Sequence, residues 1–233
     1  MIPKIIHYCW FDNENMNNLV KRCISSWKAY LPDYRLKKWD ESNCPLDTAY
    51  TRQALAEKKW SKVSNYIRLY ALYHEGGIYF DTEVEVTQSF DPLLTQNLFL
   101  GFQFQHEHTD WVNNAVIGSL PGHPFLKECM VMTENALIFN HYYYRSPEMT
   151  TLLLKKKGLR RYGFQKIDDI TLYPVDYFYP YSVAEKFDPT CITNNTFCIH
   201  HWESSWLPPL EEAPISRINR FVNKLRTKMN LLT

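Results

Sequence analysis

The stretch from Lys62 to Val86, KVSNYIRLYALYHEGGIYFDTEVEV, decides the fold. In its first part, apolar and aromatic residues recur at the helical repeat, which predicts an amphipathic helix with one face toward a core. That stripe consists of Val63, Ile67, Tyr70 and His74. Asn65 and Arg68 are three positions apart, so we expect them together on a neighbouring, outward face. Gly76 and Gly77 end the helix, because glycine readily adopts the positive φ of a helix C-terminus.

A strand is predicted directly after this turn, over Ile78–Val86, because the side chains alternate between two faces. One face carries Ile78, Phe80, Thr82, Val84 and Val86, and the other carries Tyr79, Asp81, Glu83 and Glu85. Asp81 and Glu83 therefore leave one face two residues apart and offer the oxygen ligands that Mn²⁺ or Mg²⁺ prefers. Acidic residues at a strand end are usually only solvated, but the glycine turn and the preceding Arg68 favour a functional site here.

Three blocks of the chain, in the right order, resemble one enzyme family. Residues 64–83, SNYIRLYALYHEGGIYFDTE, are similar to the pattern S-D-x-x-R-x-x-x-L-x-x-x-G-G-x-Y-x-D-x-D. That pattern marks the family 32 DXD-sugar glycosyltransferases and the related glucosylating domains of large clostridial toxins. The opening IPKIIHYCW (residues 2–10) resembles the family's first strand, and IHHWESSW (residues 199–206) resembles its late His-Ser-Trp block. The chain departs from the pattern at Asn65 and Glu83, where the family has Asp.

The resemblance implies an α/β fold of the GT-A type, with a mainly parallel central sheet flanked by helices and the donor at the strand ends. It implies a metal-dependent glycosyltransferase, a hexosyltransferase that retains the anomeric configuration and uses Mn²⁺ or Mg²⁺. The donor is expected to be a nucleotide-sugar, with a UDP-sugar favoured. The acceptor is expected to be a surface glycan or a lipid-linked glycan, as in bacterial capsular polysaccharide biosynthesis. No nucleophile stands out, so a front-face, same-side displacement is the working hypothesis.

The same resemblance implies roles for individual residues. Catalysis is expected to involve Arg68, Asp81 and Glu83. Contacts to the donor are expected from Trp10, Asn65, Arg68, Tyr79, Asp81, Ser205 and Trp206, and contacts to the acceptor from Asn113 and Asn114. The cation is expected at Asp81, Glu83 and His201. A strand places His200 and His201 on opposite faces, and the sequence does not decide which of them faces the cleft; His201 is taken as the ligand.

The rest of the chain reads as further elements of an α/β domain. Strands are expected at Lys4–Trp10, Tyr34–Trp39, Phe99–Phe104, Ala115–Ile117 and Phe197–Trp202, and helices from Asn17 or Asn18 to Tyr30, over Thr51–Trp60 and after Pro124. For Trp10, the base-stacking role implied by the resemblance and a core role are equally open. The tyrosine-rich region 140–181 fits an aromatic packing layer and a variable acceptor pocket equally well. The His106-Glu107-His108 triplet is discounted as a metal motif, because no third ligand is in reach.

Composition and charge narrow the class of protein. The 233 residues carry a net charge of +1, which gives no strong field for nucleic acid. The chain shows no signal-peptide pattern and no run of about 18 apolar residues. Its six cysteines have no C-x-x-C spacing and indicate reduced thiols. We therefore expect a cytoplasmic protein, with one glycosyltransferase domain over residues 1–210.

A separate, basic amphipathic helix is expected over residues 211–233. The part from Ile215 to Thr233 contains Arg and Lys but no Asp or Glu. Peripheral contact with the anionic inner face of a membrane and docking on the domain are both open. Membrane contact would suit a lipid-linked acceptor.

Two other functions compete with the transferase. The alternative is a sugar- or nucleotide-binding relative with impaired catalysis, and the departures at Asn65 and Glu83 motivate it. A phosphatase with Asp81 as nucleophile is disfavoured, because its D-x-D motif should follow the first strand rather than lie beyond residue 80.

Overall fold

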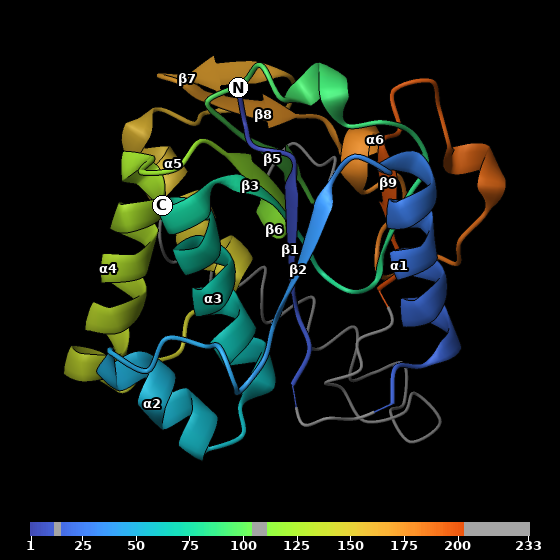
Figure 1. Cartoon of the computed structure of the whole chain (residues 1–233). Coiled ribbons are helices and arrows are strands. Elements are labelled where there is room, and N and C mark those ends of the chain that lie inside the picture. The colour runs from blue at the N-terminus through green and yellow to red at the C-terminus, as the bar shows by residue number, and fades with distance from the viewer. Residues whose placement is uncertain (12–14, 104–110, 203–233) are drawn as a thin grey trace. The chain divides into compact units, whose positions relative to one another are not determined.

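Seven strands of the described residues form one mixed sheet in the order β2-β1-β3-β6-β5-β8-β7 (Figure 1). The structure is a computed structural model that describes residues 1–11, 15–103 and 111–202. The strands of this sheet are β1 (Ile5–Cys9), β2 (Arg35–Trp39), β3 (Gly77–Phe80), β5 (Leu98–Phe102), β6 (Val112–Ser119), β7 (Gln165–Ile167) and β8 (Ile170–Tyr173). A second sheet pairs β4 (Val84–Val86) with β9 (Cys198–His200) in antiparallel fashion.

The larger sheet is mainly parallel. β2, β1 and β3 are parallel neighbours, and so are β5 and β8. Between these two groups, β6 runs antiparallel to both β3 and β5, while β7 runs antiparallel to β8 at the edge. The two reversals through β6 give β5 and β8 the direction of β3, so only β6 and β7 run the other way. The predicted α/β class with a mainly parallel sheet is therefore confirmed.

Helices cover both faces of the sheet. They are α1 (Asn18–Tyr30), α2 (Ala49–Ala56), α3 (Trp60–Glu75), α4 (Pro124–Asn140), α5 (Ser146–Lys157) and α6 (Val175–Phe178), with 3-10 turns η1 (Asp91–Leu93) and η2 (Pro189–Cys191). In Figure 1, α2, α3, α4 and α5 lie on one side, and α1 and α6 lie on the other with β9. The first helix begins where the sequence predicts, because the Asn17 side chain accepts a hydrogen bond from the backbone N–H of Val20 at 2.8 Å.

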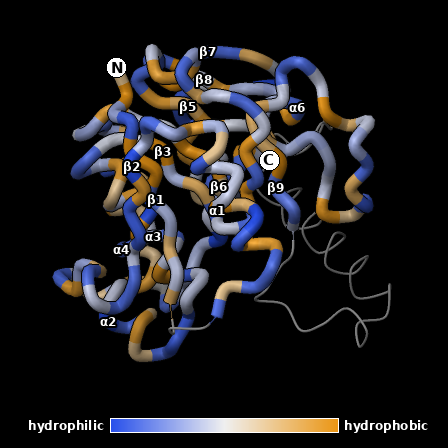
Figure 2. Tube along the Cα trace, turned by 45° about the vertical axis from the view of Figure 1, so that its right-hand side comes forward, coloured by the Kyte–Doolittle hydropathy of each residue, from blue (hydrophilic) through white to orange (hydrophobic). Residues whose placement is uncertain are grey.

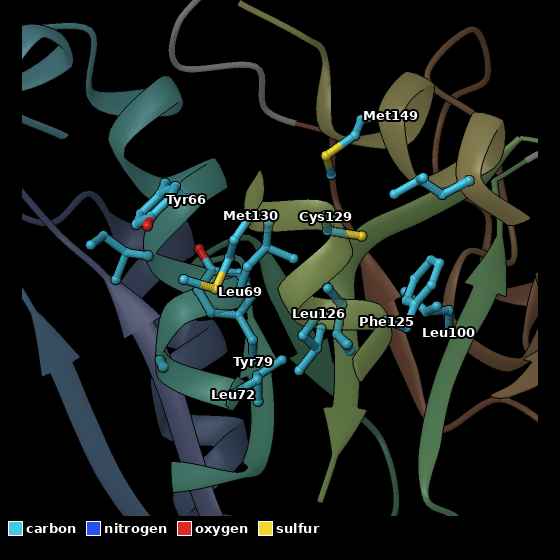
Figure 3. Close-up of a cluster of buried hydrophobic side chains, with 14 of the residues drawn as sticks. Tyr66, Leu69, Leu72, Tyr79, Leu100, Phe125, Leu126, Cys129, Met130 and Met149 are labelled. Atoms are coloured by element: carbon cyan, nitrogen blue, oxygen red, sulfur yellow. The ribbon is translucent and has the colours of Figure 1, made fainter. Parts of the chain in front are cut away.

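Two apolar clusters hold these layers together. In the first, α3 and α4 face each other over the sheet (Figure 3), with Tyr66, Leu69, Leu72, Leu126, Cys129 and Met130 among its members. The second lies on the face of α1 and includes Trp27, Phe90 and Phe178. The alternation of β3 serves both, because Tyr79 belongs to the first cluster, and Ile78 and Phe80 belong to the second. Figure 2 shows hydrophobic residues along the strands and hydrophilic ones recurring along the outer helices and loops.

The Gly76–Gly77 turn fixes the join between α3 and β3. Gly76 has φ 66° and Gly77 has φ 103°, in the region that side-chain-bearing residues rarely adopt. A Cβ on Gly77 would lie 2.6 Å from the carbonyl oxygen of Ile5 on β1. His7 closes the turn from the other side, because its Nε2 atom bonds to the carbonyl oxygen of Gly76 at 2.9 Å. The turn thereby sets where β3 begins next to β1.

The predicted strand Ile78–Val86 is wrong in its second half. β3 ends at Phe80, residues 81–83 form a turn, and β4 belongs to the other sheet. The backbone N–H of Asp81 still donates to the carbonyl oxygen of Ala115 on β6, at 2.8 Å. The N–H of Val84 instead donates to the carbonyl oxygen of Asp81, at 3.0 Å, so the chain turns away from β6 there.

Helix α3 is buried more widely than the predicted stripe. His74 is exposed, whereas Tyr66 and Leu69 are buried, because the helix packs against α4 as well as against the sheet. Arg68, which we expected to face outward, is only 5% exposed. In the tyrosine-rich region, Tyr173 and Tyr179 are buried in the second cluster, which favours the packing interpretation for that part.

Candidate active site

The carboxyl ends of β1 and β3 carry the first candidate residues. Because these strands are parallel neighbours, Trp10 after β1 and Asp81 after β3 leave the sheet at the same edge. Trp10 is half-buried, and its N–H donates to the carbonyl oxygen of Trp39 at 2.9 Å. Phe11 stacks on Trp60, the first residue of α3, with ring centres 5.7 Å apart. The N-terminal end of α3 therefore lies at this edge too, where open α/β sheets bind their ligands.

Arg68 is the buried centre of the site. Its Nη2 atom lies 3.0 Å from Oδ1 of Asp81, and its Nη1 atom donates to the carbonyl oxygen of Asn114 at 2.6 Å. The guanidinium carbon also lies 4.6 Å from the centre of the Tyr79 ring. Its Nε atom donates to the carbonyl oxygen of Ser64 at 3.3 Å, so three acceptors and one aromatic face hold a permanent positive charge in one orientation.

Tyr79 and Arg68 bond to the same oxygen of Asp81. The Tyr79 hydroxyl donates to Oδ1 at 3.0 Å. Burial raises the pKa of Tyr79 well above its ordinary value, so the hydroxyl keeps its proton and acts as a donor. The Asp81 side chain is 30% exposed, so the carboxylate reaches from the core to the surface. A ligand arriving from solvent would therefore meet the second oxygen, Oδ2.

The turn from Asp81 to Glu83 is anchored at both ends. At the first end, Asp81 bonds to β6 as described above; at the other, the carbonyl oxygen of Glu83 accepts the N–H of His201 at 3.0 Å. The Glu83 side chain is half-buried. Within residues 1–11, 15–103 and 111–202, no three His, Cys, Asp or Glu side chains lie close enough together to hold a metal ion. The structure thus does not gather Asp81, Glu83 and His201 into one cluster.

The two histidines at the end of β9 bond in different directions. His201 faces Glu85, because its Nε2 atom lies 2.6 Å from Oε2 of that carboxylate, and its Nδ1 atom lies 3.5 Å from the hydroxyl of Tyr181. His200 packs against Trp202, with ring centres 4.3 Å apart. Its Nδ1 atom is buried and has no hydrogen-bond partner among the described residues.

The charge of Asp81 affects the pKa of His200. Burial lowers the pKa of His200 to about 4, and the charge of Asp81 acts in the opposite direction. The ring is therefore neutral near pH 7 and lies within the field of the carboxylate. The two histidines thus differ in their surroundings, because the ring of His201 bonds to Glu85 and its N–H to Glu83, whereas the ring of His200 is buried and feels the charge of Asp81.

The three Asn side chains expected to bind sugar differ in how many hydrogen bonds they form within the protein. Asn65 is half-buried on α3, one turn before Arg68. Asn113 uses both ends of its amide, because Nδ2 donates to Gln103 at 3.1 Å and Oδ1 accepts the N–H of Ala115 at 2.7 Å. Asn114 donates to Thr150 Oγ1 at 2.8 Å, and its buried Oδ1 has no partner in the described part of the chain.

Several predictions lie outside the described residues. These are the donor contacts Ser205 and Trp206, the triplet His106–His108 and the helix 211–233. No described helix is both long enough and apolar enough to span a bilayer.

Sequence reasoning missed the pairing of Glu85 with His201. The sequence pattern places Glu85 on the same strand face as Glu83. Because side chains alternate along a strand, the corresponding face of the late strand carries His201 and not His200. The signal was therefore present, but the partner strand β9 lies more than a hundred residues away and its register is not visible in the sequence.

Comparison with known proteins finds similarity to glycosyltransferases. Residues 17–100 match the family described as a glycosyltransferase sugar-binding region containing the DXD motif. The human alpha-1,4-N-acetylglucosaminyltransferase is 30% identical over 174 residues, which are 68% of this chain and 48% of that protein. Inositol phosphoceramide mannosyltransferase 3 of Schizosaccharomyces pombe is 29% identical over 150 residues, which are 61% of this chain and 40% of that protein. The chain thus spans about half the length of these relatives or less.

The fold is also similar to that of a glycosyltransferase of known structure. The PaToxG glycosyltransferase superposes with a TM-score of 0.54 at 19% identity, covering 67% of this chain and 70% of that one. This likeness concerns the fold alone. The chain therefore has the GT-A fold, and its residues 17–100 match the sugar-binding region of the DXD glycosyltransferases.

Proposed function

We propose that the protein transfers a hexose from a nucleotide-sugar to a hydroxyl of a glycan acceptor, with retention of configuration and with the help of a divalent cation. The observation that carries the proposal is the buried Arg68, fixed against Asp81 and Tyr79 at the carboxyl end of β3. In the reaction, the bond between the anomeric carbon and the diphosphate oxygen breaks. A bond from that carbon to the acceptor oxygen forms, and the hydroxyl proton passes to the departing phosphate.

Arg68 is suited to the charge that develops in this step. A departing nucleoside diphosphate gains negative charge, and a fixed guanidinium stabilises it without reorganisation. The planar group has further donors beyond those used for Asp81 and Asn114. Tyr79 and Asn65 flank Arg68 on β3 and α3, where we place the ribose or sugar hydroxyls. We place the nucleotide base against Trp10.

The residues fit a hard divalent cation that shares its ligands with the donor. Oδ2 of Asp81 and the half-buried carboxylate of Glu83 supply oxygen, and a diphosphate would complete the set. The buried Nδ1 of His200, without a hydrogen-bond partner in the described chain, suits an imidazole ligand better than His201, which is committed to Glu85. When bound, Mn²⁺ or Mg²⁺ would act as a Lewis acid toward the leaving diphosphate.

The choice of donor and acceptor is also proposed. We favour a UDP-sugar and a front-face displacement, with Ser205 and Trp206 donating to the diphosphate. The name of the fission-yeast relative indicates an acceptor attached to a lipid. This supports a lipid-linked or surface glycan for the present chain, with Asn114 on the acceptor side. A cytoplasmic location and membrane contact through 215–233 belong to the same proposal.

A panel of nucleotide-sugars tests this function. Each donor is added to the purified protein with Mn²⁺ or with chelator, and the melting temperature is measured. A ligand that binds only the native state raises the free energy of unfolding by mass action, by about 2.7 kcal/mol at a concentration 100 times Kd. The melting temperature rises with it. We expect a metal-dependent rise with one UDP-sugar and, with a suitable acceptor, a product of unchanged anomeric configuration by NMR. An inverted product would overturn the front-face mechanism.

The alternative is a nucleotide-sugar-binding protein with impaired catalysis. Its support is that Oδ1 of Asp81 already takes two hydrogen bonds, while Asn65 and Glu83 stand where the family pattern has Asp. Restoring both acids, as Asn65→Asp and Glu83→Asp, separates the two functions. A gain of a hundredfold or more in turnover would favour impairment, and little change would favour an active natural variant.

A further inference from the structure

We infer that Glu85 is a positioning residue of the donor site, which holds His201 so that His200 is presented to the acidic turn. The inference rests on the proposed function, because it concerns how that site is kept in order. Glu85 belongs to neither carboxylate position of the D-x-E turn, and its side chain points at His201 rather than at Asp81. Its action on the donor is therefore indirect.

Glu85 and His201 form the centre of a small polar cluster. Because a carboxylate has no proton to give, the 2.6 Å contact requires that Nε2–H of His201 donates to Oε2 of Glu85. The other ring nitrogen, Nδ1, lies 3.5 Å from the Tyr181 hydroxyl. Arg22 of α1 approaches from the side, with its Nε atom 3.3 Å from Oε2 of Glu85. The imidazole of His201 is thus held through both nitrogens, by Glu85 and Tyr181, and Arg22 in turn holds Glu85.

The cluster acts at the place where the β4–β9 ladder stops. Before that place, the strand is already fixed to α1, because Trp27 Nε1–H donates to the carbonyl oxygen of Val84 at 2.7 Å, and Ser26 Oγ accepts the N–H of Val86 at 2.8 Å. Beyond His200, the bond from His201 N–H to the carbonyl oxygen of Glu83 continues the ladder by one step. Trp202 then adopts a left-handed φ of 55°. Glu85 therefore secures the end of the strand rather than the strand as a whole.

The bond between Glu85 and His201 also affects the orientation of His200. Neighbouring residues at a strand end point to opposite faces, so fixing the ring of His201 on one face fixes His200 on the other. His200 carries the buried Nδ1 without a partner in the described chain, and it is paired with Val84, three residues after Asp81. A metal-site histidine is commonly oriented by an outer carboxylate that bonds to it directly. Here the outer carboxylate would instead act through the adjacent histidine.

The test compares Glu85→Ala and Glu85→Gln with the control Glu128→Gln. Glu128 pairs with Lys157 at 2.8 Å on the protein surface and lies outside the site, so its variant reports the loss of an ion pair alone. Glutamine keeps an oxygen that accepts the Nε2–H bond, whereas alanine removes it. Three quantities are measured for each protein: the melting temperature, the Kd for UDP with Mn²⁺, and the ring-nitrogen NMR signals of His200 and His201 without ligand.

For Glu85→Ala we expect Kd to rise roughly 10- to 100-fold, the usual effect of removing an outer-shell partner. The signals of both histidines should move, and Glu85→Gln should restore most of the affinity. Glu128→Gln should change neither quantity. A purely structural Glu85 would lower the melting temperature equally in both variants while Kd and the His200 signals stay at the wild-type values, and that result would overturn the inference. If the wild type itself binds no nucleotide or nucleotide-sugar, the proposed function fails first, which is a different outcome.

Discussion

Arg68 and Asp81 form an ion pair at 3.0 Å whose two partners differ in exposure, because the arginine side chain is 6% exposed and the aspartate 30%. The charge of the arginine is therefore compensated inside the protein, while the carboxylate is still reached from solvent. Such an arrangement allows Asp81 to serve the fold through one oxygen and a ligand through the other.

Replacing Arg68 should damage both stability and turnover. Arg68→Ala leaves Asp81 and the Asn114 carbonyl without their buried partner and should cost about 3–5 kcal/mol. Arg68→Lys keeps the charge but cannot bridge both acceptors in one plane, and turnover should fall roughly a hundredfold. Urea unfolding and donor turnover measure the two effects. An Arg68→Lys protein with wild-type turnover would show that the planar contact is dispensable.

Removing the hydroxyl of Tyr79 should have a smaller and separable effect. Tyr79→Phe keeps the ring beneath the guanidinium but deletes the hydrogen bond to Asp81 Oδ1. We expect a loss of about 1 kcal/mol in stability. We also expect weaker dependence of UDP affinity on Mn²⁺, since the inner oxygen of the carboxylate is then held by Arg68 alone. Affinity is titrated with and without chelator, and an unchanged metal dependence would contradict the role given to Tyr79.

The glycine turn should tolerate no side chain at its second position. In Gly77→Ala the new Cβ meets the carbonyl oxygen of Ile5 at 2.6 Å, in addition to the strain of φ 103°. Gly158→Ala is the matched control, because Gly158 has φ 117° with no atom within 4 Å of its Cβ position. The control should cost about 1 kcal/mol from strain alone, and Gly77→Ala clearly more. Equal unfolding midpoints would remove the argument from close approach.

His7 should make stability fall in mild acid. Its ring is fully buried between Gly76 and Trp39, and burial lowers the pKa of His7 from 6.5 to about 4. Between these two values the unfolded chain binds more protons than the folded one, so stability present above pH 6.5 is lost as the pH drops toward 4. The loss should reach about 3 kcal/mol, from 1.36 kcal/mol per unit. His7→Gln should flatten the difference in urea unfolding between pH 7 and pH 4.5, and a parallel slope in both proteins would contradict this.

The sequence predicts the layers of this protein well and the site less well. The helix-glycine-strand unit, the first strand and the cap at Asn17 are local patterns, so they are confirmed with small changes of boundary. The break after Phe80 is not local. Alternation continues through Val86 in the sequence, and only the switch of partner from β6 to β9 interrupts it.

The buried state of Arg68 and the choice between the histidines were also beyond the sequence. A charged side chain on a helix usually faces solvent, and its burial depends on Asp81, Tyr79 and Asn114, which reach it from two other strands. Likewise, His200 and His201 differ only in which face they take, and contacts with Glu85 and Trp202 decide that. The sequence therefore predicts which residues lie near the site, but not which of them contact one another.

The pairing of Val84 with His200 joins positions more than a hundred residues apart. Closing so long a loop is slow compared with forming the local helix-strand unit, and a chain emerging from the ribosome folds its earlier part first. For a newly made chain, the fold of β1, β2 and β3 thus precedes any complete donor site. The protein should stay inactive during synthesis until residue 200 has emerged and β9 has paired with β4.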